Sequence, residues 1–174
     1  MLQRAKNLTL NFPKFHKYFR NYSENLASLE KLLYSRKPWF GLSREFYTNE
    51  DIFQVDLKKV WYRNWLFAGH SCQVRNPGDY FLFEINNEQI IIIRGDDQKI
   101  HALHNICRHR GSTICQEKKG NKNRLICPYH QWVYSKDGKL LFANEMGDDF
   151  PKSEYGLHKV FVEEIEGLIF VHLG

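Results

Sequence analysis

The chain has 174 residues, of which 43% are hydrophobic and 15% aromatic, and its formal net charge is +5. This length and apolar content fit one folded domain, with or without an additional arm. The longest aliphatic run covers only residues 90–93, and the N-terminus lacks an apolar segment followed by a small-residue cleavage site. We therefore expect no membrane span and no secretory signal, and we place the protein in the cytoplasm with its four cysteines outside disulfides.

The excess positive charge lies near the N-terminus. Residues 1–45 contain nine Lys and Arg against three acidic residues, whereas residues 46–174 contain sixteen against seventeen. A nucleic-acid partner would require a basic surface on the folded part together with a recognition motif, and the sequence shows neither. We interpret residues 1–41 as a flexible basic leader with a short helix, capped by Ser23 and stopped by Pro38.

Residues 42–68 read as a helical lead-in segment. Asn49 is a typical N-cap, and the apolar residues that follow it recur at helical spacing, namely Ile52, Phe53, Leu57, Val60 and Trp61. Residues 65–69 are apolar or small and predict a buried strand that follows this helix.

Short strands separated by turns predominate after Asn76. The expected strands cover residues 79–85, 89–94, 99–104, 132–135, 139–142, 157–163 and 168–173. The Asp137-Gly138 pair between two of them is a strong hairpin signal. Many short strands with regular turns predict a mainly β fold, an antiparallel sandwich or barrel preceded by short helices.

Two loops in this region carry candidate metal ligands. Cys107 and His109 form Cys-x-His, and Cys127 and His130 form Cys-x-x-His after seventeen intervening residues. Each loop thus supplies one thiolate and one imidazole. This mixed pairing suits a Rieske [2Fe–2S] cluster, in which two Cys hold one iron and two His hold the other. The pattern therefore predicts an electron-transfer site.

A structural zinc site is the main alternative for these four residues. Zinc fingers usually pair Cys with Cys and His with His at their own spacings, whereas both pairs are mixed in this chain. The two remaining cysteines, Cys72 and Cys115, are expected to be small buried hydrophobic residues.

From about residue 42 to residue 174 the chain resembles the large (α) subunit of Rieske non-haem iron ring-hydroxylating oxygenases. The motifs that carry the resemblance are Phe46-Tyr47-Thr48, residues 61–70 (WYRNWLFAGH), residues 77–80 (PGDY), both cluster loops, Tyr134, Asp137-Gly138 and residues 167–171 (GLIFV). Within the family, Cys-Arg-His-Arg-Gly-Ser and Cys-Pro-Tyr-His-Gln-Trp are most similar to the branch that acts on quaternary amines such as glycine betaine. Aromatic-ring dioxygenases more often carry Gly at the position of Gln131.

The resemblance implies a Rieske domain at residues 69–174 with two cluster-binding loops. In it Cys107 and Cys127 would ligate one iron, and His109 and His130 the other. The surroundings of the cluster would include Arg110, Gly111, Tyr129 and Trp132. Arg110 and Gly111 would shape the first loop and Trp132 would shield the cluster, although ordinary packing is an equally good interpretation of Arg110 and Trp132.

The family role implied is the transfer of single electrons from a reductase or ferredoxin toward a non-haem iron oxygenase site that oxidises aromatic rings or quaternary amines. That second site uses two His and a carboxylate, for which we find no free set here. We therefore expect the mononuclear Fe(II) only in a C-terminal catalytic domain, of the same or of a neighbouring subunit. We also expect the 174 residues alone not to be competent for oxygenation. A truncated α subunit, a split gene product and a free-standing ferredoxin-like carrier all remain open, and the N-terminal leader favours the first.

Overall fold

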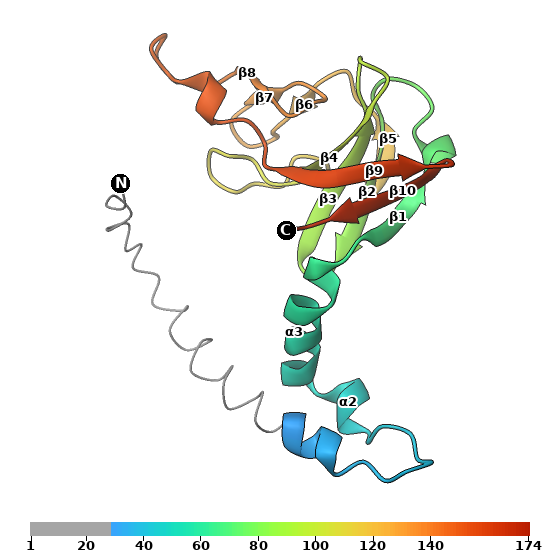
Figure 1. The fold of residues 1–174 in the computed structure, drawn as a ribbon. Helices are drawn as coiled ribbons and strands as arrows, with labels where there is room; N and C mark the ends of the chain where they lie inside the picture. The colour runs from blue at the N-terminus through green and yellow to red at the C-terminus, as the bar shows by residue number, and fades with distance from the viewer. Residues whose placement is uncertain (1–28) are drawn as a thin grey trace, which may run out of the picture. The chain divides into compact units, whose positions relative to one another are not determined.

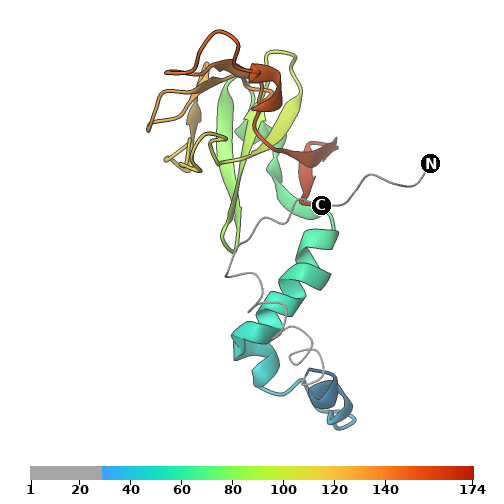
Figure 2. The same ribbon diagram turned by 90° about the vertical axis from the view of Figure 1, so that its left-hand side faces the viewer.

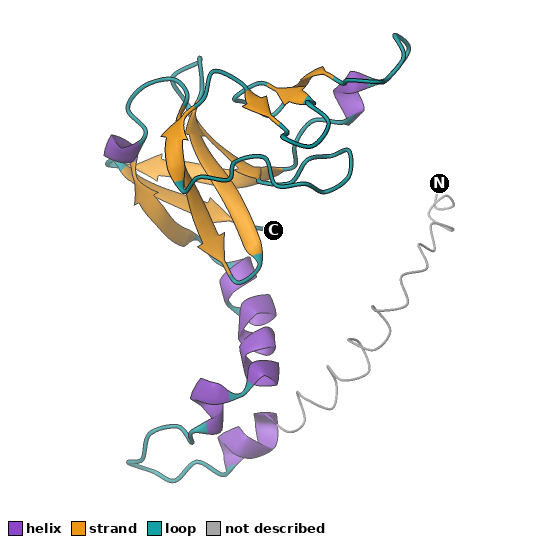
Figure 3. Ribbon diagram, turned by 180° about the vertical axis from the view of Figure 1, so that it is seen from behind, coloured by secondary structure: helices purple, strands orange, loops and turns teal. Residues whose placement is uncertain are grey.

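The computed structural model describes residues 29–174. The chain divides into two compact units, Met1–Trp61 and Tyr62–Gly174. Among the described residues, Figure 3 shows helix as the regular structure of the first unit and strands as the main structure of the second. No helix in residues 29–174 is long and apolar enough to cross a membrane.

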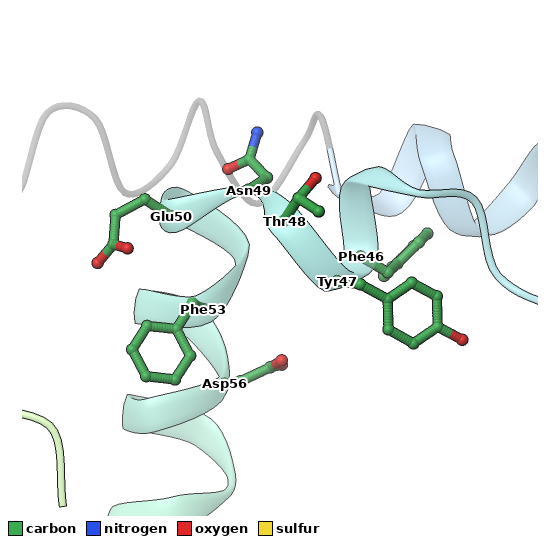
Figure 4. A pocket seen from close by; sticks show the side chains of 7 residues that line it. All are labelled: Phe46, Tyr47, Thr48, Asn49, Glu50, Phe53 and Asp56. Atoms are coloured by element: carbon green, nitrogen blue, oxygen red, sulfur yellow. The ribbon is translucent and has the colours of Figure 1, made fainter.

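In the first unit, residues 29–34 are helical, and α2 (Glu45–Thr48) and α3 (Glu50–Lys59) follow. The Oδ1 atom of Asn49 accepts hydrogen bonds from the backbone N–H groups of Asp51 and Ile52, at 2.8 and 3.2 Å. This N-cap confirms the helix start predicted at Asn49. The proposed cap at Ser23 lies outside the described residues. Figure 4 shows the shallow hollow between α2 and α3, lined by Phe46, Tyr47, Thr48, Asn49, Glu50, Phe53 and Asp56.

The second unit is built on a seven-stranded antiparallel sheet with the order β1-β10-β9-β4-β3-β2-β5 (Figure 1). Its strands are β1 (Leu66–His70), β2 (Asp79–Ile85), β3 (Glu88–Arg94), β4 (Ile100–His104), β5 (Lys119–Asn121), β9 (Lys159–Ile165) and β10 (Leu168–His172). Short 3-10 helices occupy Trp61–Arg63, Ser71–Gln73 and Lys152–Glu154. The predicted mainly β antiparallel fold is confirmed.

A second, three-stranded sheet has the order β6-β7-β8, with β6 (Leu125–Ile126), β7 (Val133–Tyr134) and β8 (Leu140–Phe142). Figures 1 and 2 both show it at one end of the longer strands. The predicted Asp137-Gly138 hairpin joins β7 to β8, and the amide N–H of Gly138 donates to the Ser135 carbonyl over 3.0 Å.

The aliphatic run 90–93 is buried on both faces of the large sheet. Ile91 and Ile93 belong to a core that also contains Cys107 and Cys127, and Ile90 and Ile92 belong to a second core. All four isoleucines have no exposed surface. Alternating side chains of one central strand therefore join the two cores, which explains a continuous apolar run in an antiparallel sheet.

Three details differ from the predictions. The strand expected to be buried near residues 65–69 is β1, an edge strand in which only Gly69 is buried. The prediction that Cys72 is buried is wrong, because this residue is exposed in the 3-10 helix after β1, whereas Cys115 is buried as expected. The strands β5 and β6 were not predicted, since two or three residues carry too little alternation.

Candidate metal centre

The first cluster-binding loop, residues 107–112, follows β4 and is closed by its own backbone. The N–H of Cys107 donates to the carbonyl of Ser112 over 2.8 Å, and the N–H of Gly111 donates to the carbonyl of Cys107 over 3.0 Å. Gly111 has φ 71°, a left-handed conformation that costs glycine little. An isolated bridge between Ile106 and Thr113 fastens the base of the loop.

The second cluster-binding loop, residues 127–132, lies between β6 and β7 and repeats this scaffold. The N–H of Cys127 donates to the carbonyl of Trp132 over 2.9 Å, and the N–H of Gln131 donates to the carbonyl of Cys127 over 3.0 Å. Gln131 adopts φ 57°, so a side-chain-bearing residue takes the left-handed position that Gly111 holds in the first loop. The two scaffolds place a cysteine at the start of each loop and a histidine two or three residues later.

The thiols of Cys107 and Cys127 meet inside the core and are 2% and 1% exposed. Burial raises the pKa of the Cys107 thiol, and a contact with the Tyr134 hydroxyl, 3.2 Å from Sγ, partly opposes this effect. The same hydroxyl oxygen accepts a hydrogen bond from the backbone N–H of Arg108 over 3.2 Å. Burial, followed by the contact with Cys107, raises the pKa of Tyr134, so the phenol keeps its proton and can donate it to the sulfur.

The imidazoles of His109 and His130 lie against each other, with ring centroids 4.6 Å apart. Trp132 is fully buried and stacks on His109 at 4.8 Å with an interplanar angle of 4°. Exposed Tyr129 lies beside His130 with ring centroids 3.7 Å apart. Burial, then the neighbouring His130 and Arg110, lowers the pKa of His109, which favours the neutral form that binds metal. Arg110 itself is exposed.

Orphaned polar atoms gather at this site. The Nδ1 atoms of both His109 and His130 and the Nε1 atom of Trp132 are buried and have no hydrogen-bond partner within residues 29–174. Leaving such an atom unsatisfied costs about 1–3 kcal/mol, so buried groups of this kind call for a partner. Two buried thiols next to two unpartnered imidazole nitrogens match the donor set of a Rieske [2Fe–2S] cluster. The residues present therefore fit this group.

The four side chains come as two pairs, thiol with thiol and imidazole with imidazole. Among residues 29–174, no group of three or more His, Cys, Asp or Glu side chains is arranged around a single metal ion.

Asn105, which the sequence pattern did not single out, holds the segment after the first loop. Its Oδ1 accepts from the backbone N–H groups of Ile114 and Cys115 at 3.1 and 2.8 Å, and its Nδ2 donates to the Cys115 carbonyl at 2.8 Å. Burial raises the pKa of the Cys115 thiol to about 11, so this cysteine stays protonated near neutral pH. The sequence shows an Asn shortly before the first cluster-binding loop. Only its burial marks it as important, and a single sequence does not show burial.

Comparisons with a family model and with known proteins indicate the same family. The model of the Rieske [2Fe–2S] domain matches residues 64–151. The glycine betaine monooxygenase oxygenase subunit of Pseudomonas aeruginosa is 42% identical over 143 residues, which cover 82% of this chain and 33% of that protein. The benzene 1,2-dioxygenase subunit alpha of Pseudomonas putida is 37% identical over 129 residues, covering 72% of this chain and 29% of that protein.

Solved structures agree with this result. The quaternary ammonium Rieske monooxygenase CntA superimposes with a TM-score of 0.69 at 31% identity, over 75% of this chain and 37% of that chain. Naphthalene 1,2-dioxygenase from Rhodococcus sp. gives a TM-score of 0.76 at 28% identity, over 84% of this chain and 34% of that chain. The chain thus spans about a third of the length of the relatives it matches.

Proposed function

Because the chain belongs to the Rieske [2Fe–2S] domain family, we propose that it takes up and passes on single electrons through a cluster held by the two loops. In this proposal Cys107 and Cys127 ligate one iron, and His109 and His130 ligate the other through Nδ1. The observation that carries the assignment is the pair of buried, unpartnered Nδ1 atoms beside two buried thiols. The bound cluster would supply a one-electron redox couple.

The surrounding residues have separate tasks in this proposal. Tyr134 donates its hydroxyl hydrogen to Cys107 Sγ and ties the small sheet to the first loop. Trp132 stacks on His109 and contacts Phe150 and Tyr155 with ring centroids 5.4 and 6.0 Å away, which excludes water from that side. Gly111 and Gln131 set the backbone of the two loops, Arg110 favours neutral His109, and Tyr129 covers His130.

We also propose that this domain, at residues 69–174 after a lead-in segment at 42–68, serves an oxygenase of the α-subunit type. The similarity to subunits of a glycine betaine monooxygenase and of a benzene dioxygenase supports this role, and the higher identity to the former favours a quaternary-amine substrate. A reductase or ferredoxin would donate electrons. The acceptor would be a mononuclear Fe(II) site in a catalytic domain outside these 174 residues, in the same or a neighbouring subunit. We propose a cytoplasmic setting for this electron transfer.

A reductive titration tests the electron-transfer role. The purified chain should accept one electron per bound cluster from a chemical reductant and return it to an added one-electron oxidant. A colourless protein that holds zinc and takes up no electrons would overturn the proposal.

A further inference from the structure

A hollow of about 440 Å³ opens beside the first cluster-binding loop. It is lined by His104, Ile106, Cys107, Arg108, His158 and Lys159. The lining comes from the end of β4, the start of the first loop and the start of β9. β4 and β9 are paired strands, so these segments lie next to each other (Figure 1).

The charge of this lining is not balanced. Arg108 and Lys159 form no ion pair with a carboxylate among the described residues, although carboxylates pair with other cations of the same unit such as Arg94 and Lys136. His104 has its own acidic partner, because its Nδ1 lies 3.4 Å from Glu88 Oε2. Within residues 29–174, two cationic side chains of this lining therefore have no carboxylate partner of their own.

Arg108 is held in place while keeping hydrogen-bonding capacity. One of its terminal nitrogens contacts His158 Nε2, and burial, Arg108 and His104 lower the pKa of His158, so a neutral imidazole accepts from the guanidinium. His158 is itself fixed by its carbonyl, which accepts from the His104 N–H over 2.9 Å. The Nε of Arg108 is buried, so a ligand from solvent does not reach it. The second terminal nitrogen of the guanidinium is not among the buried atoms that lack a partner, and a charged N–H of this kind is a strong donor for a carboxylate.

We propose that this hollow, formed around Arg108 and Lys159, is a carboxylate-binding site whose ligand is an acidic side chain of the protein that delivers electrons to the chain. This inference rests on the proposed function. Two features favour a side chain of a protein over a free acid. The hollow adjoins Cys107, a proposed ligand of the cluster, so a protein bound there would lie close to the redox centre, and Ile106 is 45% exposed beside it and offers apolar contact. An apolar contact next to charged groups is typical of protein interfaces.

The test uses the cluster-containing chain and a reduced acidic [2Fe–2S] ferredoxin as the probe. The variants are Arg108→Gln and Lys159→Gln, with Lys119→Gln as a control. Lys119 is an exposed lysine of β5, an edge strand of the same sheet, so the control makes the same change in net charge away from the hollow. Photoreduced deazariboflavin, an uncharged reductant, measures the reduction of the cluster without docking.

At low ionic strength, we expect each hollow variant to lower the second-order rate constant with ferredoxin by at least about threefold, whereas Lys119→Gln stays within about twofold of the wild type. The difference should vanish at high salt, and deazariboflavin should reduce the wild type, Lys159→Gln and Lys119→Gln at one rate. Equal rates for Lys159→Gln and Lys119→Gln would overturn the proposal. If Arg108→Gln fails to retain the cluster, the comparison of Lys159→Gln with Lys119→Gln tests the proposal by itself, because Lys159 is exposed.

Succinate at constant ionic strength separates the two sources of a carboxylate. Weak competition with ferredoxin, lost in Lys159→Gln, supports a side chain of the partner. Tight saturable binding of succinate together with unchanged ferredoxin rates in the variants would show a small-acid site and overturn the docking role. A wild-type chain that even deazariboflavin cannot reduce would contradict the proposed function itself, which is a different failure.

Discussion

The two cluster-binding loops have the same backbone hydrogen bonds. They differ in the residue at the left-handed position and in the sheet from which each loop extends. Both are closed by one hydrogen bond from the first residue of the loop to the last and one back to the first residue. The left-handed position is Gly111 in the first loop and Gln131 in the second. Since the same geometry forms with either residue, backbone hydrogen bonds and burial determine it, and glycine only lowers its cost.

The loops also differ in their foundations. The first extends from β4 of the seven-stranded sheet, and the second connects β6 and β7 of the small sheet. Tyr134 of β7 links them, because its hydroxyl contacts Cys107 and Arg108 in the first loop. We therefore expect the second loop to depend more on local support and the first to depend on Tyr134.

The largest effect is expected where the two loops are equivalent. Cys107→Ser and Cys127→Ser should each abolish cluster binding, because both thiols are needed to hold one iron. Buried Cys115→Ser and exposed Cys72→Ser are the matched controls and should retain iron and acid-labile sulfide. Loss of the cluster in Cys115→Ser but not in Cys127→Ser would refute the equivalence of the loops.

The hairpin between β7 and β8 follows the second loop, and its residue Asp137 predicts a stability that depends on pH. Burial would raise the pKa of Asp137, but hydrogen bonds from Ser135 and the ion pair with Lys139 at 2.9 Å outweigh it and lower that pKa to about 2. A carboxyl with a lowered pKa stabilises the fold above its unfolded pKa, and this contribution is lost between about pH 4 and pH 2. Asp137→Asn should lower the free energy of unfolding by about 2 kcal/mol at pH 7.

Urea denaturation at several pH values checks this expectation. The difference between wild type and Asp137→Asn should stay constant from pH 7 to pH 5 and shrink below pH 4. A difference that stays the same between pH 4 and pH 2 would mean that the pKa of the aspartate is not lowered in the folded state.

Some features of the fold and of the site could be predicted from the sequence, and others could not. Alternation and turn residues predicted the longer strands, and the two Cys/His pairs predicted the chemistry of the site, because both signals are local. The contact of Tyr134 with Cys107 joins residues 27 positions apart, so it could not be predicted from local sequence. The left-handed conformation of Gln131 follows from the hydrogen bonds that close the whole loop, and the residue type at this position does not indicate it. The burial of Asn105 and the exposure of Cys72 depend on tertiary packing, which a pattern of residue types does not contain.

The support of the first loop is tested by Tyr134→Phe. Removal of the hydroxyl should leave the cluster in place and lower its reduction potential, because a hydrogen bond to a ligating sulfur favours the reduced, more negative state. One such bond corresponds to a shift on the order of 50 mV. Spectroelectrochemistry measures this shift, and an unchanged potential would show that the hydroxyl bonds only to the backbone of Arg108.

The smallest effects should have opposite signs in the two loops. Gly111→Ala introduces a Cβ that meets no atom within 4 Å, so its cost comes from the left-handed backbone alone, about 1 kcal/mol. Gln131→Gly should relieve that cost in the second loop and stabilise the domain by up to about 1 kcal/mol. The thermal midpoint, followed by cluster absorption, should fall by a few degrees in the first variant and rise in the second. A fall in both would show that the Gln131 side chain contributes more than its backbone costs.

In the proposed site, each loop contributes one thiolate and one imidazole nitrogen to a single cluster. Pulsed electron paramagnetic resonance of the reduced chain labelled with ¹⁵N-histidine measures this directly. We expect two directly coordinated histidine nitrogens in the wild type and the loss of this pattern in His109→Ala and His130→Ala. A spectrum without coordinated histidine nitrogen, as expected for a cluster held by four cysteines including Cys72 and Cys115, would contradict it.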